Sequence, residues 1–408
     1  MFNHSNPIVI TGMGTVSVHG TDDAALWHDI SNGEVQYGEL SEIALGKPVR
    51  GIRIHEWNYE PLLGKRGLQF LHSCSKYLMG SSLVALANAG LNLEDVVPEE
   101  LGIVIGTNFS GMRMAALYDE ILMTEGPNYV SPMEGPNTIV NSPASYLAIK
   151  INARACNTTI TTGANSGFDA LGNASTLLRK GAAKYVVVGG VEELNESVIW
   201  FYDKAGLLPS ERYEEAGLPF HPGSSGWIPA EGAASVVLER KSDALARGAT
   251  ILAELVSWSS TFAAVDTAEK RADGIKRSML GALQKGDVPL DQVGLVLTGA
   301  SGLSKQDQAE AMAVDSCFGT YEVPVSAIKG VIGESNGASG IFQLFAAVRS
   351  LQTNTIPATV GLPSLSGEYP QLNTCQEARV GLTRSSDKVL LTSQDLFGAS
   401  SAIVVGRL

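Results

Sequence analysis

Short sequence patterns typical of buried strands alternate with helical patterns along the whole chain. Several of the strand patterns end in a glycine. The first half contains PIVITGMGTVS, LGIVIGTN and AKYVVVGGVEE, and the second half contains ILAELVSW, VGLVLTGAS, KVLLTSQ and SAIVVGRL. Helical patterns, such as the one over residues 78–89, lie between these strands. Strands that alternate with helices indicate mixed or parallel sheets covered on both faces, so the sequence predicts an α/β fold.

The alternation occurs in two halves that look alike and join near residues 241–248. We therefore expect an N-terminal half over residues 1–247 and a C-terminal half over residues 248–408. The first half also contains a less regular insertion, rich in proline and glycine, at about residues 108–142. Irregular stretches of that length in compact domains are often functional, which makes this segment a candidate for a functional role.

Charge and hydropathy exclude several classes of partner. The 408 residues carry a formal net charge of −13, which argues against nucleic acid because phosphate binding needs a cationic face. No apolar segment approaches the length that crosses a bilayer, so no membrane partner is expected. The opening MFNHSNPIVITGMG lacks the basic segment and the long apolar run of a signal peptide, and we expect a cytoplasmic protein.

Neither the cysteines nor the histidines have the spacing of a metal site. The cysteines contain no CxxC pair, and in a cytosolic chain they are expected to be reduced and mostly buried. The histidines form no HxxxH or HExxH pattern, so we expect neither a metal nor another cofactor. The residues concerned are Cys74, Cys156, Cys317, Cys375, His4, His19, His28, His55, His72 and His221.

The stretch ITTGANSGFD, residues 160–169, has the pattern of a turn that presents a nucleophile. A β-rich run meets a glycine and small residues, and apolar residues at helical spacing follow. A cysteine at such a helix N-terminus would have a lowered pKa and would act as a thiolate. Ala164 stands where that reactive side chain would be expected, and a methyl group is no nucleophile at any pH.

Five motifs, in order and at family-like intervals, resemble those of the β-ketoacyl synthase family. They are VITGMGTVSVHG, LGIVIGTNFSGM, SPMEGPNTIVNSPASYLAIK, SGWIPAEGAASVVLER and VPVSAIKGVIGESNGASG, so the resemblance runs essentially from end to end. It implies the thiolase fold of that family, in which two similar α/β halves form a five-layered αβαβα architecture.

The active residues of that family are a cysteine at the elbow, which attacks a thioester, two histidines and a lysine. The histidines stabilise the enolate and the oxyanion that develop during decarboxylative condensation. The cysteine position falls on Ala164. The lysine is retained as Lys329, and the gate motif near the C-terminus is reduced to LFGAS, in which Phe397 is kept.

Both histidine positions are also changed. Alignment on Asp307 and Glu310 puts the first at Gly299, within one residue, and the second falls on Glu334. An anionic carboxylate would repel an oxyanion where a hydrogen-bond donor is needed. An engineered replacement of the cysteine would explain Ala164 alone, and not the other two losses.

One subfamily lacks the cysteine and keeps the fold. The stretch GASGLSKQDQAEAMAV resembles the chain length factor, or ketosynthase β-subunit, of bacterial type II polyketide synthases. Many chain length factors have glutamine at the cysteine position, where this chain has Ala164 followed by Asn165. The resemblance implies a heterodimer with an active ketosynthase and an acyl carrier protein that delivers the polyketide, and we favour an aromatic product over a polyene. The alternative is a divergent β-ketoacyl synthase or malonyl-thioester decarboxylase that acts alone.

In chain length factors, the helix after the Gly-Thr landmark lines the far end of the tunnel. That segment is NFSGMRMAALYDE in this chain. Phe109 and Met112 lie three residues apart, and Met112 and Ala116 lie four apart, so the three would share one helical face if the helix begins near Phe109. The alternative interpretation is that these are ordinary core residues. The candidate chain-length residues are Phe109, Met112, Arg113, Ala116 and, in the following loop, Met133.

Several other residues have two interpretations each. Glu231 is interpreted as a structural carboxylate more readily than as a general base, and Lys329 is expected to pair with either Glu334 or Glu231. His221 is interpreted as a structural or surface residue. Lys65 and Arg66 form either a solvated basic surface or a docking site for the acidic carrier protein.

The resemblance also implies how a partner subunit would bind. In this fold the strand before the elbow, here about residues 157–162, pairs with its counterpart across a two-fold axis. One sheet then runs through both subunits, which removes an exposed edge.

Overall fold

The computed structural model describes residues 6–41, 43, 45, 47–209, 216–264, 267–319, 321–361, 372–382 and 387–408. Its main sheet has eleven strands in the order β12-β10-β9-β14-β15-β8-β1-β7-β6-β4-β5. Two small ribbons are formed by β2 (Gly38–Glu39) with β3 (Arg50–Gly51) and by β11 (Thr355–Ile356) with β13 (Arg379–Val380). The strands of the main sheet are β1 (Ile8–Val16), β4 (Leu101–Gly106), β5 (Asn157–Ile160), β6 (Tyr185–Glu192), β7 (Gly232–Arg240), β8 (Ala253–Phe262), β9 (Val293–Leu297), β10 (Pro324–Ser326), β12 (Asn373–Thr374), β14 (Lys388–Gln394) and β15 (Ala399–Gly406).

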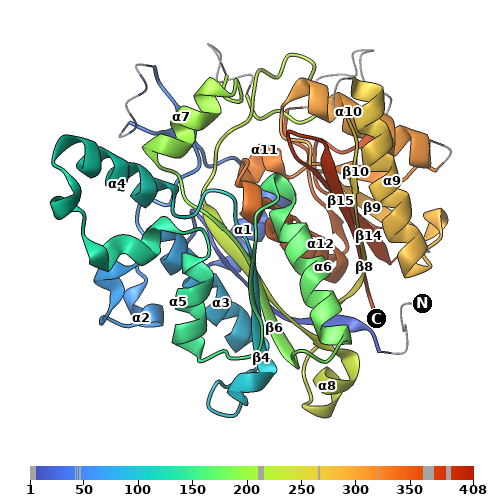
Figure 1. Cartoon of the computed structure of the whole chain (residues 1–408). Helices are drawn as coiled ribbons and strands as arrows, with labels where there is room; N and C mark the ends of the chain where they lie inside the picture. The colour runs from blue at the N-terminus through green and yellow to red at the C-terminus, as the bar shows by residue number, and fades with distance from the viewer. Residues whose placement is uncertain are drawn as a thin grey trace.

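Helices cover both faces of this sheet and separate its two halves, which gives five layers (Figure 1). On one outside, α3 (Ser73–Asn88) covers β1, β6 and β7, with α5 (Ser142–Ile151) beside it. In the middle, α6 (Ser166–Arg179) contacts α12 (Ser339–Thr353). On the other outside, α9 (Ala268–Gly286) covers β8 and β15 and packs on α10 (Ser304–Phe318). The predicted α/β fold is confirmed.

The two halves of the sheet are continuous because β1 pairs with β8 over three residues, Ile8–Ile10. The remaining α-helices are α1 (Asp23–Asn32), α2 (Glu60–Leu63), α4 (Met112–Thr124), α7 (Glu196–Lys204), α8 (Lys241–Ala246) and α11 (Lys329–Ile332). The segment 108–142, expected as an irregular insertion, contains α4 and two 3₁₀ helices, η3 (Pro127–Tyr129) and η4 (Pro132–Thr138). The division of the chain after residue 247 stays a prediction.

Glycines bring α6 against the sheet, and this contact positions the elbow. A Cβ added to Gly106, the last residue of β4, would lie 2.6 Å from the backbone carbon of Ser166. A Cβ added to Gly167 would lie 2.9 Å from the backbone oxygen of Gly337. Only glycine allows backbones to approach this closely. The apolar positions of α6 that the sequence predicts are all fully buried, namely Phe168, Leu171, Ala174 and Leu178.

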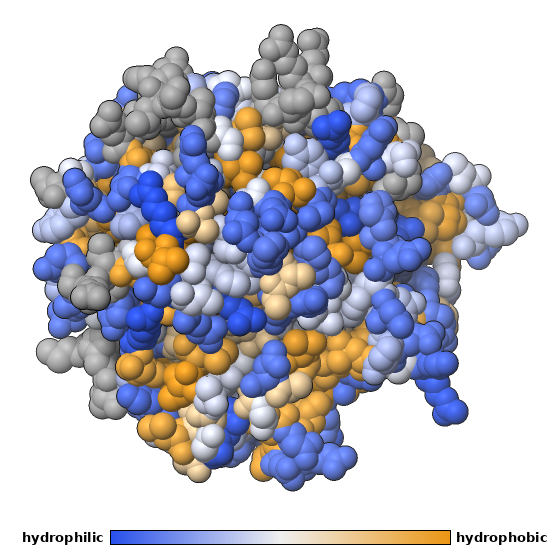
Figure 2. Space-filling view, turned by 180° about the vertical axis from the view of Figure 1, so that it is seen from behind, coloured by the Kyte–Doolittle hydropathy of each residue, from blue (hydrophilic) through white to orange (hydrophobic). Residues whose placement is uncertain are grey.

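The outer surface mixes side chains of both kinds. Figure 2 shows the face opposite to that of Figure 1, where hydrophobic patches lie among hydrophilic ones. Such a mixture is usual on protein surfaces, because there is not enough polar area to cover them. Within the described ranges, no helix has both the length and the apolar character that crossing a membrane requires.

Candidate functional site at the elbow

The elbow is a short turn between the edge strand β5 and the buried helix α6. The 3₁₀ helix η5 (Gly163–Asn165) begins with Gly163 in the left-handed region, at φ 63°. The Ser166 hydroxyl closes the turn: it accepts from the Thr162 backbone N–H at 2.8 Å and donates to the Gly163 carbonyl at 2.7 Å. Ala164 is therefore held at the start of α6, 6% exposed.

A pocket of about 350 Å³ opens beside this turn, and it brings together residues that are distant in the sequence. Five residues that the sequence singled out line it: Phe109, Ala164, Gly299, Glu334 and Phe397. Its other described lining residues are Asn108, Thr161, Thr162, Gly163, Phe201, Tyr202, Trp227, Gln306, Asn336, Gln394, Asp395 and Leu396.

At Gly299, which the sequence analysis placed at the first histidine position, the backbone leaves little room for a side chain. A Cβ added to Gly299 would lie 3.0 Å from the carbonyl oxygen of Thr392 and 3.2 Å from the Cα of Ser393. The Gly299 N–H donates to the carboxylate of Glu310 at 2.9 Å. Burial raises the pKa of Glu310, which also accepts from the Thr392 hydroxyl. Position 299 therefore accommodates a glycine more easily than a residue with a side chain.

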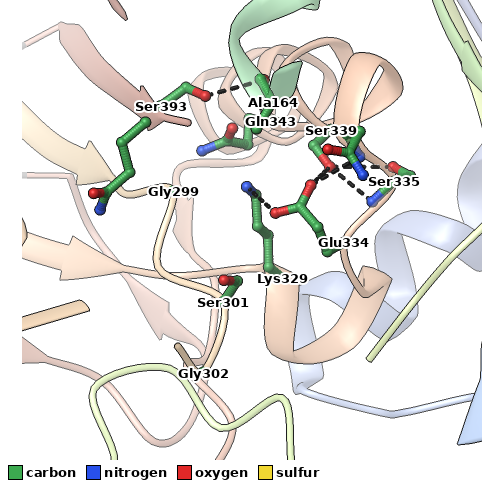
Figure 3. A network of polar contacts seen from close by, with 12 residues as sticks. Ala164, Gly299, Ser301, Gly302, Lys329, Glu334, Ser335, Ser339, Gln343 and Ser393 are labelled. Atoms are coloured by element: carbon green, nitrogen blue, oxygen red, sulfur yellow. Dashed lines mark hydrogen bonds and ion pairs between the residues drawn. The ribbon is translucent and has the colours of Figure 1, made fainter. Parts of the chain in front are cut away.

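Glu334, which the sequence analysis placed at the second histidine position, forms a buried ion pair with Lys329. Figure 3 shows the two side chains pointing toward one another, and Nζ lies 2.6 Å from Oε2. The other carboxylate oxygen accepts from the Asn336 N–H at 2.8 Å and from the Ser339 hydroxyl at 2.7 Å. Of the two partners expected for Lys329, Glu334 is confirmed. Because both of its oxygens are engaged, Glu334 is a poor candidate for a general base.

The gate loop is fixed by a carboxylate that the sequence analysis did not single out. Oδ1 of Asp395 accepts from the backbone N–H groups of Phe397 at 2.9 Å, Gly398 at 2.7 Å and Ala399 at 2.8 Å. Burial raises the pKa of Asp395. The guanidinium of Arg271 donates a hydrogen bond to the backbone carbonyl of Asp395 at 2.7 Å. Phe397 itself is 71% exposed at the pocket.

One wall of the pocket is aromatic. The ring of Phe109 lies 5.5 Å from that of Phe201 and 5.6 Å from that of Tyr202, and the ring of Tyr202 lies 5.3 Å from that of Trp227. The sequence analysis missed all of these except Phe109. The available signals were the aromatic run IWFYDK and the tryptophan within SGWIPAEGA.

Two further glutamates, Glu192 and Glu231, are buried and do not line the pocket. Glu192 accepts from the Phe109 N–H at 3.1 Å and from the Gly337 N–H at 3.3 Å, and burial raises its pKa to about 8. Glu231 accepts from the N–H groups of Ile54 and Leu194, both at 2.9 Å. Glu231 does not line the pocket, so its contacts agree with the structural interpretation.

The chain-length candidates separate into two groups. Phe109 precedes α4 and lies in the pocket. The condition for a shared helical face is not met, because α4 begins at Met112, whose N–H donates to the Phe109 carbonyl at 3.1 Å. Met112 packs beside Phe109 in one apolar cluster. Arg113, Ala116 and Met133 are exposed and lie outside the pocket.

The remaining candidates lie away from the pocket. Lys65 and Arg66 are exposed, and Lys65 has only a long contact, 3.6 Å, with Glu60. His221 accepts from the Gly223 N–H at 2.9 Å, a local turn contact. The four cysteines are free thiols, while His4 lies outside the described residues. Within the described part of the chain, no group of three or more His, Cys, Asp or Glu side chains is arranged to hold a metal.

A nucleophile-type elbow on a helix buried between two α/β halves defines the architecture of thiolase-like condensing proteins. The model of the β-ketoacyl synthase N-terminal domain matches residues 5–244, and that of the C-terminal domain matches residues 252–363. The chain therefore belongs to the β-ketoacyl synthase family.

Curated relatives support the same family at low identity. The chain is 25% identical over 410 residues to a 3-oxoacyl-[acyl-carrier-protein] synthase 2 of Coxiella burnetii, with 98% of each chain covered. It is 27% identical over 366 residues to the protein of that name from Vibrio harveyi, with 87% of this chain and 88% of the relative covered.

Solved structures share the fold. The ishigamide ketosynthase/chain length factor superposes with a TM-score of 0.89 at 20% identity and 99% coverage of both chains. A β-ketoacyl synthase from Burkholderia phymatum gives 0.89 at 22% identity, covering 99% of this chain and all of that one. The AntDE:AntF complex, a type II polyketide synthase ketosynthase with its acyl-carrier protein, gives 0.84 at 21% identity with the same coverage. The predicted thiolase-like fold is confirmed.

Proposed function

We propose that this chain is a chain length factor, a noncatalytic subunit that pairs with an active ketosynthase and shapes the tunnel in which a polyketide grows. It would act in the cytoplasm, in type II polyketide and thus antibiotic biosynthesis, with an aromatic product favoured. One observation carries the proposal. The elbow is built and buried as a nucleophile's position would be, yet it presents only the methyl group of Ala164 to the pocket.

The described lining of the pocket lacks the side chains that the family uses for condensation. None of its described lining residues is a cysteine, serine, histidine or lysine. Gly299 offers no side chain, and Glu334 offers a carboxylate that is already paired with Lys329. A negative group cannot stabilise a developing oxyanion, which needs hydrogen-bond donors. These features support a role without condensation chemistry in this subunit.

Exposed apolar side chains in residues 117–149 support binding of a partner subunit. Helix α5, which ends this segment, packs on β5, and β5 is an edge strand whose only neighbour among the described strands is β4. An open sheet edge next to apolar surface favours pairing with a second subunit. The exposed apolar side chains of this region all come from residues 117–149: Leu117, Leu122, Met123, Tyr129, Met133, Ile139 and Ile149.

The same surface accommodates the chain-length role. Arg113, Ala116 and Met133 are exposed in the single chain, so a partner bound over α4 would enclose them. Met112 connects this surface to Phe109 in the pocket. The exposed Lys65 and Arg66 would meet the acidic carrier protein. The likeness to the ishigamide ketosynthase/chain length factor and to the AntDE:AntF complex supports these partners.

The second candidate is a divergent β-ketoacyl synthase or malonyl-thioester decarboxylase that acts alone. The names of the curated relatives, 3-oxoacyl-[acyl-carrier-protein] synthase 2, favour it. It would need a catalytic group that replaces the cysteine, and the described pocket lining contains no cysteine, serine, histidine or lysine.

The test is co-purification with a ketosynthase that has an intact Cys–His–His set and is encoded beside this chain. We expect the tagged chain to retain that partner and the pair, not the single chain, to condense malonyl units. Met123→Asp should abolish retention, because it places a charge in the proposed interface. Val380→Asp is the matched control, since Val380 is 86% and Met123 84% exposed. Condensation by the purified single chain would favour the second candidate.

A further inference from the structure

A second pocket lies where one face of α6 meets β8 and the end of α9, and it shares no described residue with the elbow pocket. Its lining includes Ser175 and Arg179 from α6, Trp258 from β8 and Lys285 from α9. Gly172 lets the strand approach the helix, because a Cβ added to it would lie 2.3 Å from the Trp258 ring. The lining residues of α6 are three and four residues apart, so they share one helical face.

The charges that line this pocket have one sign. Arg179 and Lys285 are both cations, and no Asp or Glu occurs among the described lining residues. Each cation stands in the last turn of its helix, where the helix dipole favours positive charge. The dipole accounts for each cation singly, but it does not require that two of them, from different helices, meet at one pocket. A cleft lined by one sign of charge attracts the opposite charge.

The ammonium group of Lys285 is only loosely held by the protein. Its Nζ lies 3.2 Å from the backbone oxygen of Trp258 and 3.5 Å from Oγ of Ser259, at or beyond the long end of the usual range. It also lies 5.5 Å from the centre of the Trp258 ring. Within the described part of the chain it forms no ion pair. Because an ammonium has three N–H donors, it can still bind an anion in the pocket.

The guanidinium of Arg179 is half-buried. Burial lowers its pKa, since the loss of water disfavours the charged form, and the carboxylate of Glu254 opposes that shift. Glu254 does not line the pocket, and it also interacts with Lys241 and Lys388. Nε of Arg179 donates to Oγ of Ser175 over a long 3.4 Å. An anion in the pocket would therefore stabilise Arg179 in addition to Glu254.

The volume limits the size of that anion. The pocket holds about 70 Å³, and a water molecule occupies roughly 10–15 Å³ of such space. About five waters or one small oxyanion fit, whereas a nucleotide or an acyl chain does not. The hydroxyl of Ser175 accepts from Arg179 and keeps a proton that it can donate to an oxygen in the pocket.

The pocket is connected to the elbow by two hydrogen bonds. Nε1–H of Trp258 donates to Oδ1 of Asp169 at 3.3 Å, and Oδ2 of Asp169 accepts from the Thr162 hydroxyl at 2.7 Å. Thr162 is the residue before the elbow turn and follows the edge strand β5 closely. A group bound against Trp258 therefore lies near the strand at which the partner subunit is expected to pair.

We propose that this pocket binds a small oxyanion, such as a phosphate or a carboxylate, between Lys285 and Arg179 with the Ser175 hydroxyl as a further donor. Hydrogen bonds of this kind, in which donor and acceptor are both charged, are the strong ones. The oxyanion is either a free solute or an acidic side chain of the partner subunit. The inference goes beyond the proposed function and rests on it only in the second case.

The test is calorimetric titration of the full chain with inorganic phosphate, at constant ionic strength in sodium chloride. We expect saturable binding that is weakened about tenfold by Lys285→Met, which removes the charge and keeps most of the stem. Lys180→Met is the matched control and should change the affinity less than about twofold, because Lys180 directly follows α6, is exposed and does not line the pocket. Dimethyl sulfone, a neutral molecule with the shape of sulfate, should not bind. Thermal melting establishes that each variant is folded.

Titration of the co-purified pair distinguishes the two sources. Phosphate binding by both the single chain and the pair would assign the site to a free anion, and binding by the single chain only would assign it to an acidic side chain of the partner. No saturable phosphate binding by the single chain, unchanged affinity in folded Lys285→Met, or equal binding of dimethyl sulfone would overturn the proposal. The titration of the single chain depends neither on condensation nor on partner retention, so the proposed function can fail or succeed independently.

Discussion

Lys329 Nζ lies 2.6 Å from Glu334 Oε2, and both side chains are almost completely buried, at 1% and 2% exposure. The sequence analysis assigned Lys329 to the lysine position of the family and Glu334 to one of its histidine positions. A buried charge is tolerated only when it is paired, so each residue explains why the other is present. Glu334, at the predicted second histidine position, is thus part of the structural core.

Breaking this pair should destabilise the protein strongly. Lys329→Met leaves the Glu334 carboxylate buried without its cation, and we expect a loss of about 3–5 kcal/mol in the free energy of unfolding. The double variant Lys329→Met/Glu334→Leu should recover much of that loss, because no unpaired charge remains. Denaturant titration measures both. Lys65→Met, which removes an exposed lysine 3.6 Å from Glu60, is the control and should change stability by less than about 1 kcal/mol.

Glu192 should make stability depend on pH in a defined direction. Burial raises its pKa from 4.5 to about 8, so the folded state binds a proton that the unfolded state releases above about pH 4.5. The contribution of this group is therefore present at low pH and is lost as the pH rises from about 4.5 to about 8. Glu192→Gln cannot titrate. We expect its stability relative to the wild type to increase by about 1 kcal/mol per pH unit across that window.

The measurement is denaturant unfolding of both proteins at several pH values between 5 and 8. Comparing the difference between the two proteins removes the contributions of the other buried carboxyls, which both proteins share. A pH-independent difference would mean that Glu192 is ionised in the folded state and is held by the N–H groups of Phe109 and Gly337.

The sequence predicted the parts of the fold that depend on local pattern. The elbow and the buried face of α6 follow from Gly163 and from apolar spacing, because left-handed backbone and amphipathic helices have short-range signals. The end of α1 is similar, since Gly33 adopts φ 76° directly after the helix.

The parts that were missed depend on three-dimensional contacts that have no simple sequence pattern. The carboxylate of Asp395 organises its own loop through the N–H groups of residues 397–399. The aromatic wall combines residues from positions 109, 201 and 227, which are distant in the sequence. The start of α4, which the sequence analysis left as a condition, has a local cause. Gly111 has φ 83°, which is incompatible with a continuous helix from Phe109.

Restoring the nucleophile alone should not restore condensation. Ala164→Cys places a thiol at the N-terminus of α6, where it can become acylated, but the two histidine positions remain Gly299 and Glu334. Without the two histidines, we expect condensation to stay at the background level. Mass spectrometry of the acylated protein and product analysis measure the two steps separately. Robust condensation by this single variant would contradict the account of the site.

Adding the histidine at position 299 should carry a structural cost. A Cβ there meets the Thr392 carbonyl at 3.0 Å, so Gly299→His must displace β14 or the loop after β9. We expect it to destabilise the protein by about 1–3 kcal/mol in denaturant titration. Gly248→His is the control: Gly248 has open space around its Cβ position, although its φ of 73° adds a smaller backbone cost.

Changes in bulk at the α4 segment should change the length of the product. Met112→Ala removes volume next to Phe109 and should permit longer polyketides, whereas Ala116→Trp adds volume on the surface that the partner would cover and should shorten them. Phe109→Leu is preferable to Phe109→Ala, because full truncation would also remove the contacts with Phe201 and Tyr202. It should act in the same direction as Met112→Ala, and more weakly.

The mass distribution of polyketides made by the reconstituted pair is the measurement. Ala246→Trp, on the exposed helix α8, is the matched control for the added indole and should leave the distribution unchanged. Total polyketide output separates a shift in length from a loss of activity. A chain-length role requires Met112→Ala and Ala116→Trp to move the distribution in opposite directions, because one enlarges and the other reduces the same enclosed space. If folded variants with normal output leave the distribution unshifted, this segment does not set chain length.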